Sequence, residues 1–267
     1  MALRSARFIP VALALTVLVV VPALFASPAG VSASTESSMS SATLSLMNAD
    51  RARLGLTALR IDPRMTNLAI DRAQWMASTG EMSHQSYGGE VWDALDSMGV
   101  ATYSSGEAIG STTANWGTDA AEYLYGLWRG SPEHWDLMMS ATYNYIGIGM
   151  GFRSETGETY GSLVFAEAPD STRPGAEMTG AGASGRTVFF TWTGRDGRLQ
   201  THTAGLRDFD VQYRVDNGAW STIRTHITST QLILTNRPAG HSYSARVRDR
   251  DRRNNLSPGS SVRTVRI

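Results

Sequence analysis

The sequence changes its hydrophobic periodicity once, and that change limits the folds open to it. Between residues 41 and 168, segments with helical spacing alternate with short apolar strand patterns. From residue 186 to residue 267, apolar residues alternate only as they do in strands, with turn signals between them. The intervening residues 169–185 are rich in glycine and hold two prolines, which is typical of a linker. We therefore predict a mixed helix and sheet domain followed by an all-β domain.

The clearest helix prediction in the first domain covers residues 63–79. Asp62 is a suitable N-cap, Pro63 suits the first helical position, and Gly80 suits the end. One apolar stripe at helical spacing is formed by Met65, Leu68, Ala69, Ala73 and Met76. Further helices are predicted over residues 41–53, 89–98 and 119–128, and strands over residues 145–152 and 160–165.

The second domain has the pattern of a β-sandwich. Phe209, Val211, Tyr213 and Val215 share one face of a predicted strand, and polar residues occupy the other face. Asp216-Asn217-Gly218 follows, which is a strong hairpin signal, and Trp220 is expected to open the returning strand. About 80 residues of short strands with turns between them favour a sandwich.

The N-terminus has the features of a signal peptide. Arg4 and Arg7 precede an apolar run of 15 residues, Val11 to Phe25, and small residues up to Ala33 provide a cleavage site. We predict a signal peptide over residues 1–33, cleavage after Ala33, a disordered serine-rich spacer over residues 34–40, and a secreted protein. An uncleaved membrane anchor is the less favoured alternative, because a spanning helix needs roughly 20 apolar residues.

Composition excludes several kinds of chemistry. The chain has no cysteine, so it cannot form a disulfide, a thiol nucleophile or a lipid-modified cysteine anchor. All 24 of its basic residues other than histidine are arginine, and a phosphate-binding P-loop cannot exist without lysine. The sequence also contains no His-Glu-x-x-His zincin motif and no Gly-x-Ser-x-Gly nucleophile elbow.

Charge is distributed unevenly, although the whole chain is formally neutral. Residues 34–182 hold 8 Arg against 18 Asp and Glu, a net charge of −10, whereas residues 183–267 hold 14 Arg against 6 Asp, a net charge of +8. A basic sandwich could bind an anionic cell-wall polymer or a membrane surface, could face its acidic neighbour, or could simply be solvated. Nucleic acid is not an expected partner of an exported chain. The oligomeric state is left open.

Several motifs of the first domain occur together in a fixed order. They are Asn48-Ala-Asp-Arg51 with Gly55-Leu56; Ala69, Arg72-Ala73 and Met76 with Ser83-His84; Gly106-Glu107; Trp128-Arg-Gly-Ser131-Pro132-Glu133-His134; and Ile146-Gly147-Ile148-Gly149 with Tyr160 and Phe165. This order resembles the bacterial type of the CAP family (cysteine-rich secretory, antigen and pathogenesis-related proteins, also called SCP-like) over residues 41–168. Residues 186–267 resemble a fibronectin type III domain less specifically, through Trp192, Tyr213, Pro238, Tyr243, Ala245 and Val247. The resemblance implies an α+β chain, with an α/β/α sandwich followed by an all-β immunoglobulin/fibronectin-like sandwich.

The CAP resemblance also implies a cleft. Carried over by motif, its polar residues are His84, Glu107 and His134, and some family members bind a divalent metal there. Imidazoles and carboxylates suit zinc, so these three residues are candidate metal ligands, although no cofactor is required. The sequence departs from the family pattern at Ala108, where asparagine is usual, and at Leu163, where glutamine is frequent. A fourth member of the cluster has no secure counterpart.

These observations lead to a prediction of a non-catalytic extracellular binding module. Its cleft would hold a small molecule, a lipid or a divalent metal, and its basic sandwich would contact the cell wall or another surface. The alternative is a metal-dependent hydrolase that uses His84, Glu107 and His134, and a purely structural scaffold is a third possibility. Tyr87 and Trp116 are candidate exposed contacts, whereas Trp128 is expected in the core.

Overall fold

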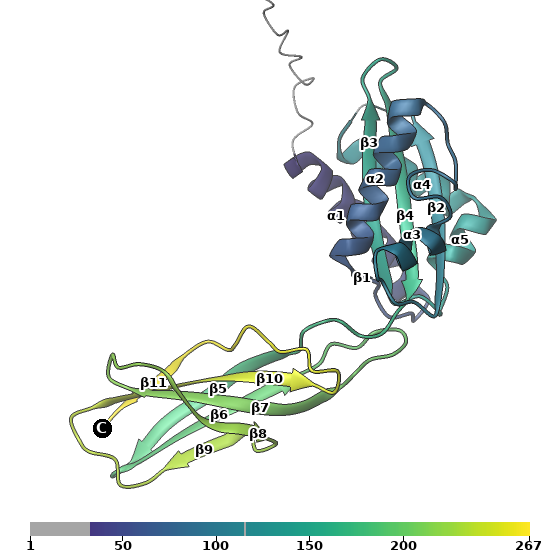
Figure 1. Cartoon of the computed structure of the whole chain (residues 1–267). Coiled ribbons are helices and arrows are strands. Elements are labelled where there is room, and N and C mark those ends of the chain that lie inside the picture. Colours follow the sequence, from purple (N-terminus) through teal and green to yellow (C-terminus); the bar gives the residue numbers. More distant parts are fainter. Residues whose placement is uncertain (1–32, 115) are drawn as a thin grey trace, which may run out of the picture.

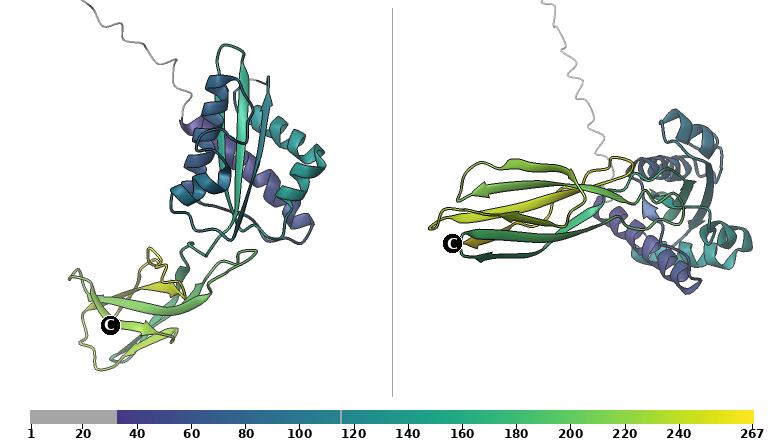
Figure 2. Two further views of the ribbon diagram at one scale, coloured as in Figure 1. Left: turned by 45° about the vertical axis from the view of Figure 1, so that its right-hand side comes forward. Right: turned by 90° about the horizontal axis from the view of Figure 1, so that it is seen from below.

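A computed structural model describes residues 33–114 and 116–267 (Figure 1). The predicted signal peptide therefore lies outside the described residues, apart from Ala33 at its end. Within the described part of the chain, no helix has the length and apolar character needed to cross a membrane. The chain forms an N-terminal domain of helices around one sheet and a C-terminal domain of strands alone (Figures 1 and 2).

The N-terminal domain has three layers. Its sheet has the strand order β1-β3-β4-β2, and only the β1–β3 pair is parallel. The strands are β1 (Arg60–Ile61), β2 (Ser104–Thr112), β3 (Tyr145–Arg153) and β4 (Glu158–Glu167). Helices α2 (Pro63–Thr79) and α3 (Val91–Ser97) cover one face. The other face is covered by α1 (Ala33–Arg53), α4 (Thr118–Gly130) and α5 (Pro132–Met138).

Three glycines of β3 allow α2 to lie directly on the sheet. A Cβ atom added to Gly147 would lie 2.1 Å from the backbone of Met65, and one added to Gly149 would lie 2.1 Å from the backbone of Ala69. At Gly151 the nearest backbone atom, in Ala73, would be 2.3 Å away. These contacts explain why apolar residues and glycines alternate in this strand: the apolar side chains face α1 and α4, and the glycines face α2.

The prediction of a disordered spacer over residues 34–40 is wrong, because α1 begins at Ala33 and includes that stretch. The serines of the stretch have modest helix propensity. However, Met39 is fully buried and joins Met47 in the core on this face of the sheet. Tertiary packing therefore stabilises a helix that local propensity does not predict.

The C-terminal domain consists of two antiparallel sheets around one core. The first sheet has the order β11-β10-β7-β8 and the second the order β5-β6-β9. The strands are β5 (Gly175–Ser184), β6 (Thr187–Arg195), β7 (Leu206–Val215), β8 (Ser221–Ile227), β9 (Gln231–Leu234), β10 (Ser242–Asp251) and β11 (Arg263–Arg266). Trp192 and Phe190 of one sheet pack in the same core as Val211 and Tyr243 of the other.

Two predicted boundaries in this half of the chain shift. Strand β5 occupies most of the predicted linker 169–185, because its small residues pair with β6 and Met178 enters the core. The connection between the domains is therefore short. The hairpin signal itself forms the turn, in which Gly218 N–H donates to the Val215 carbonyl at 3.0 Å, and Trp220 lies just before β8 rather than inside it.

The β6–β7 loop of the C-terminal domain contacts the base of the N-terminal domain. Leu199 from this loop is 1% exposed and belongs to the core cluster of α2 and α3. Next to it, Asn144 donates to the Thr201 carbonyl at 3.0 Å, and the Gln200 side chain accepts from the Thr57 amide at 2.6 Å. Apolar and polar contacts therefore join the two domains.

Candidate functional site

The candidate site is built around the carboxylate of Glu107, which lies on β2 and is 2% exposed. Arg72 of α2 binds it in a bidentate ion pair, from Nε to Oε1 at 2.6 Å and from Nη2 to Oε2 at 2.8 Å. Ser162 of β4 donates to Oε1 at 2.9 Å. His84 Nδ1 lies 2.9 Å from Oε2. Both carboxylate oxygens of Glu107 are therefore fully engaged.

Arg72 also shapes the loop that carries His84. The guanidinium is fully buried and donates to the backbone carbonyls of His84 at 2.6 Å, Tyr87 at 2.8 Å and Gly89 at 2.8 Å. A buried guanidinium must satisfy its donors within the protein. The ion pair with Glu107 and these carbonyls do so, and they fix the loop against the sheet.

His84 is oriented by this arrangement and remains accessible. A carboxylate that is paired with a guanidinium only accepts hydrogen bonds, so His84 donates from Nδ1. Its side chain is 55% exposed, and its other ring nitrogen, Nε2, has no hydrogen bond to any described residue. In the neutral imidazole this nitrogen carries the lone pair. It can therefore accept a hydrogen bond from a ligand.

His134 lies in the first turn of α5. Burial lowers the pKa of His134, the charge of His84 lowers it further, and Glu133 opposes the shift. Among the described residues, no hydrogen bond joins the two imidazoles, and the effect of His84 on His134 is electrostatic. A lowered pKa favours the neutral form of His134. Of the three residues predicted from sequence, His84 and Glu107 are in direct contact, whereas His134 is linked to His84 only by an electrostatic effect.

The donor set does not fit a metal ion held by His84, Glu107 and His134 together. Both oxygens of Glu107 already bind other groups, and coordination would compete with the Arg72 guanidinium. In the described part of the chain, two other triads bring their ligand atoms within 4.8 Å of one another, and neither includes these residues. They are Asp208, Asp210 and His226, and Asp170, Asp196 and Asp251. Arg250 pairs with both aspartates of the first, and backbone amides donate to all three aspartates of the second.

Comparison with known proteins identifies the N-terminal half of the chain. Residues 44–165 match the model of the CAP family, the cysteine-rich secretory protein family. This match supports a CAP domain in the N-terminal half of the chain, and we call the N-terminal domain the CAP domain. An uncharacterized protein of Bacillus subtilis (strain 168), YkwD, is 29% identical over 106 residues, which make up 39% of each chain. This chain thus matches about two fifths of that relative's length.

Solved structures are similar to each half of the chain. An extracellular protein containing an SCP domain from Bacillus anthracis str. Ames aligns with a TM-score of 0.42 and 23% identity, over 49% of this chain and 41% of that one. A cysteine-rich secretory protein from Staphylococcus aureus subsp. aureus Mu50 gives 0.39 and 19%, over 51% and 41%. An Fn3-like protein from Clostridium thermocellum gives 0.26 and 23%, over 35% and 92%. The fibronectin type III assignment of the C-terminal domain stays a prediction.

Sequence reasoning missed two residues of the CAP-domain site, Arg72 and Ser162. Arg72 had a detectable signal, because it lies at helical spacing within the apolar stripe of residues 65–76, where a charge needs a buried partner. Ser162 had no such signal in the sequence, because its hydrogen bond to Glu107 depends on the pairing of β4 with β2.

The aromatic predictions have mixed outcomes. Trp128 is 1% exposed in the CAP-domain core, as expected. Tyr87, whose carbonyl binds Arg72, is 52% exposed beside the His84 loop. Trp116 is only partly exposed, because it packs against the core and its ring lies 5.8 Å from that of Phe152. Of the two candidate exposed contacts, only Tyr87 is freely accessible.

Proposed function

We propose that this chain is an exported bacterial binding protein without catalytic activity, and that its CAP domain binds a small organic ligand at the surface formed by His84 and His134. The saturation of Glu107 is the observation that carries this proposal. Arg72, Ser162 and His84 occupy both of its oxygens. Glu107 therefore positions His84, and a metal could bind it only by displacing one of these partners.

Two imidazoles and one exposed ring remain for a ligand. His84 offers Nε2 as an acceptor, a lowered pKa favours the neutral form of His134, and the exposed Tyr87 ring, three residues after His84 in the chain, provides apolar contact area. These groups suit an uncharged ligand that carries hydroxyl or amide donors beside an apolar portion. The hydrolase alternative has less support, because its metal would need the carboxylate that Arg72 holds.

Native mass spectrometry can test this proposal with three proteins, the wild type, the His84→Ala/His134→Ala double variant, and a Glu81→Gln variant as an exposed control. Each is incubated with a lipid extract and with soluble cell-wall fragments. An organic adduct is expected on the wild type and the control and not on the double variant. Zinc content should be negligible in all three. Peptidase or esterase turnover that the double variant lacks would contradict the proposal and support a hydrolase.

We also propose that the C-terminal domain attaches the protein to an anionic polymer through the outer face of its β7–β10 sheet. The alternate residues Tyr243, Ala245 and Val247 of β10 are buried, so Arg246 and Arg248 lie on the outer face. Arg214 and Arg246 place their guanidinium groups 4.6 and 4.5 Å from the centre of the Trp220 ring. None of these three arginines forms an ion pair with a described residue. They remain available to phosphate or carboxylate groups.

Sedimentation with purified cell walls tests this attachment. At low salt the full chain should pellet, and 0.5 M salt should release it, because screening weakens exposed ionic contacts. The Arg246→Gln/Arg248→Gln variant should pellet several-fold less than an Arg173→Gln/Arg195→Gln control, which loses the same charge at other exposed positions. If both variants lost pelleting equally, the net charge of the domain, and not the position of its arginines, would determine the attachment. Retention that ignores salt would exclude an electrostatic attachment.

A further inference from the structure

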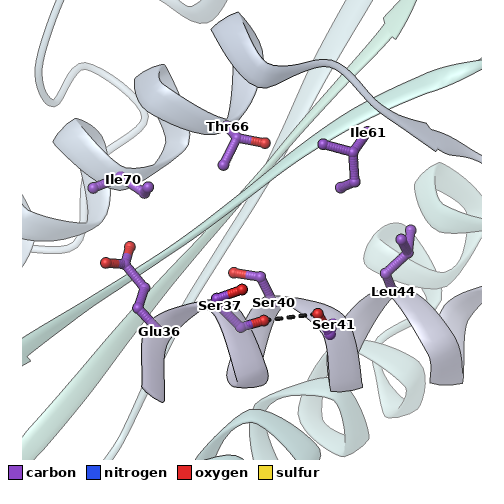
Figure 3. Close-up of a pocket in the computed structure, with 8 residues that line it drawn as sticks. All are labelled: Glu36, Ser37, Ser40, Ser41, Leu44, Ile61, Thr66 and Ile70. Atoms are coloured by element: carbon purple, nitrogen blue, oxygen red, sulfur yellow. Dashed lines mark hydrogen bonds between the residues drawn. The ribbon is translucent and has the colours of Figure 1, made fainter. Parts of the chain in front are cut away.

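A groove between α1 and α2 is a second candidate ligand site of the CAP domain. It encloses about 340 Å³, a volume within the range of small-molecule sites. Its wall on the α1 side carries Glu36, Ser37, Ser40, Ser41 and Leu44, and the facing wall carries Ile61, Thr66 and Ile70 (Figure 3). None of these residues belongs to the His84 cluster.

The groove lies along an edge of β3 that no described strand covers. Strand β1 pairs only with Tyr145 and Ile146, so the rest of that edge faces α1. Ser40 donates to the Ile148 carbonyl at 3.3 Å, and the Met150 amide hydrogen-bonds to the Glu36 carboxyl group. These bonds fix α1 against the edge and hold Glu36 in one orientation. Figure 3 shows its carboxyl group directed toward Ile70.

Two polar atoms in the groove are shielded from solvent and lack a hydrogen-bond partner among the described residues. They are Oε1 of Glu36 and Oγ1 of Thr66. Burying such an atom without a partner is unfavourable, because the atom loses its hydrogen bonds to water and gains none in return. Glu36 also forms no ion pair with a described arginine or histidine, in a segment whose net charge is −10 over residues 34–182. A bound cation with several donors would satisfy both atoms and neutralise the carboxylate.

We propose that this groove binds a small aliphatic ammonium compound. The ammonium group contacts Glu36 and Thr66, and the alkyl chain extends toward Leu44 and Ile61. An ammonium group offers three donors and one positive charge, which matches the two unpartnered oxygens. Residues 36 to 44 of α1 span roughly 12 Å at the helical rise, which sets the length of the chain. An anionic head group would be repelled by Glu36, and a neutral one would leave the carboxylate without a counter-charge.

Three probes of equal chain length test the choice of head group, namely octylammonium, octanol and octanoate. Binding to the full protein is measured by calorimetry and by methyl NMR shifts of Ile61 and Ile70. Octylammonium should bind saturably and at least tenfold more tightly than octanol, and octanoate should not bind. Equal affinity for the three probes, or no saturable shift with octylammonium, would overturn the proposal.

Variants localise the binding and separate it from the His84 site. Glu36→Gln should abolish the preference for the ammonium group, and Leu44→Trp should fill the groove and block all three probes. Glu81→Gln removes the same charge from an exposed position and should change affinity less than twofold. His84→Ala should leave binding in the groove unchanged. The groove can therefore fail to bind octylammonium while the proposed function holds, and the proposed function can fail while the groove binds octylammonium. Full retention of ammonium preference in Glu36→Gln would contradict the assignment.

Discussion

At the scale of single residues, Arg72 connects the buried Glu107 carboxylate to the loop that carries His84. It binds Glu107 and three loop carbonyls while fully buried. We expect Arg72→Met to cost about 3–5 kcal/mol of unfolding free energy, because it leaves a buried carboxylate unpaired. Urea denaturation would measure this loss, and adding Glu107→Gln should restore part of it. Arg64→Met on the same helix breaks a pair whose arginine is half-exposed, and should cost under ~1 kcal/mol.

Asp249 is a buried residue that should weaken the fold at neutral pH. It is fully buried, and neither carboxylate oxygen has a hydrogen-bond partner among the described residues. Burial raises the pKa of Asp249, and the nearby Ser257 hydroxyl opposes the shift. A raised pKa in the folded state means that stability is lost as pH rises from the ordinary aspartate range through the folded pKa. Asp249→Asn should therefore raise Tm at pH 7 by roughly 4 °C, the effect of ~1 kcal/mol on a small domain, and calorimetry at pH 4 should show a smaller gain.

At the scale of elements, the β3–α2 contact depends on glycine. A Cβ atom at Gly149 would lie 2.1 Å from the backbone of Ala69, so Gly149→Ala should push α2 from the sheet and cost about 3 kcal/mol or more. Gly126 on α4 is exposed and has open space around it, so Gly126→Ala should instead stabilise by ~0.5–1 kcal/mol. Thermal unfolding of both variants tests the contact. A loss below 1 kcal/mol at Gly149 would show that the packing adjusts easily.

The same elements show what sequence reasoning could and could not predict. Helix α2 was predictable over its full length, because Asp62, Pro63 and Gly80 mark its ends locally. The start of α1 was not, since its serine-rich turns are held by the burial of Met39 and by a bond from Ser40 to β3. His84 and Glu107 could be named from motifs. Their direct contact, and the neutralisation of Glu107 by Arg72, depend on strand and helix placement that a linear sequence does not contain.

At the scale of the whole molecule, Leu199 links the two domains, because this side chain of the C-terminal domain is buried in the core of the N-terminal one. Domains joined by a short connection move relative to one another unless their interface is substantial. Here Leu199 enters the CAP-domain core, and Asp170 accepts from Tyr145 of β3 at 3.1 Å and from the Ala204 amide at 2.9 Å. Leu199→Ser should therefore increase the radius of gyration in solution scattering and speed proteolysis at residues 168–174, while both domains stay folded. Ile233 lies on β9 of the C-terminal domain and is 55% exposed. Ile233→Ser should therefore change neither the radius of gyration nor the rate of proteolysis. An unchanged scattering curve for Leu199→Ser would mean that the polar contacts alone fix the junction.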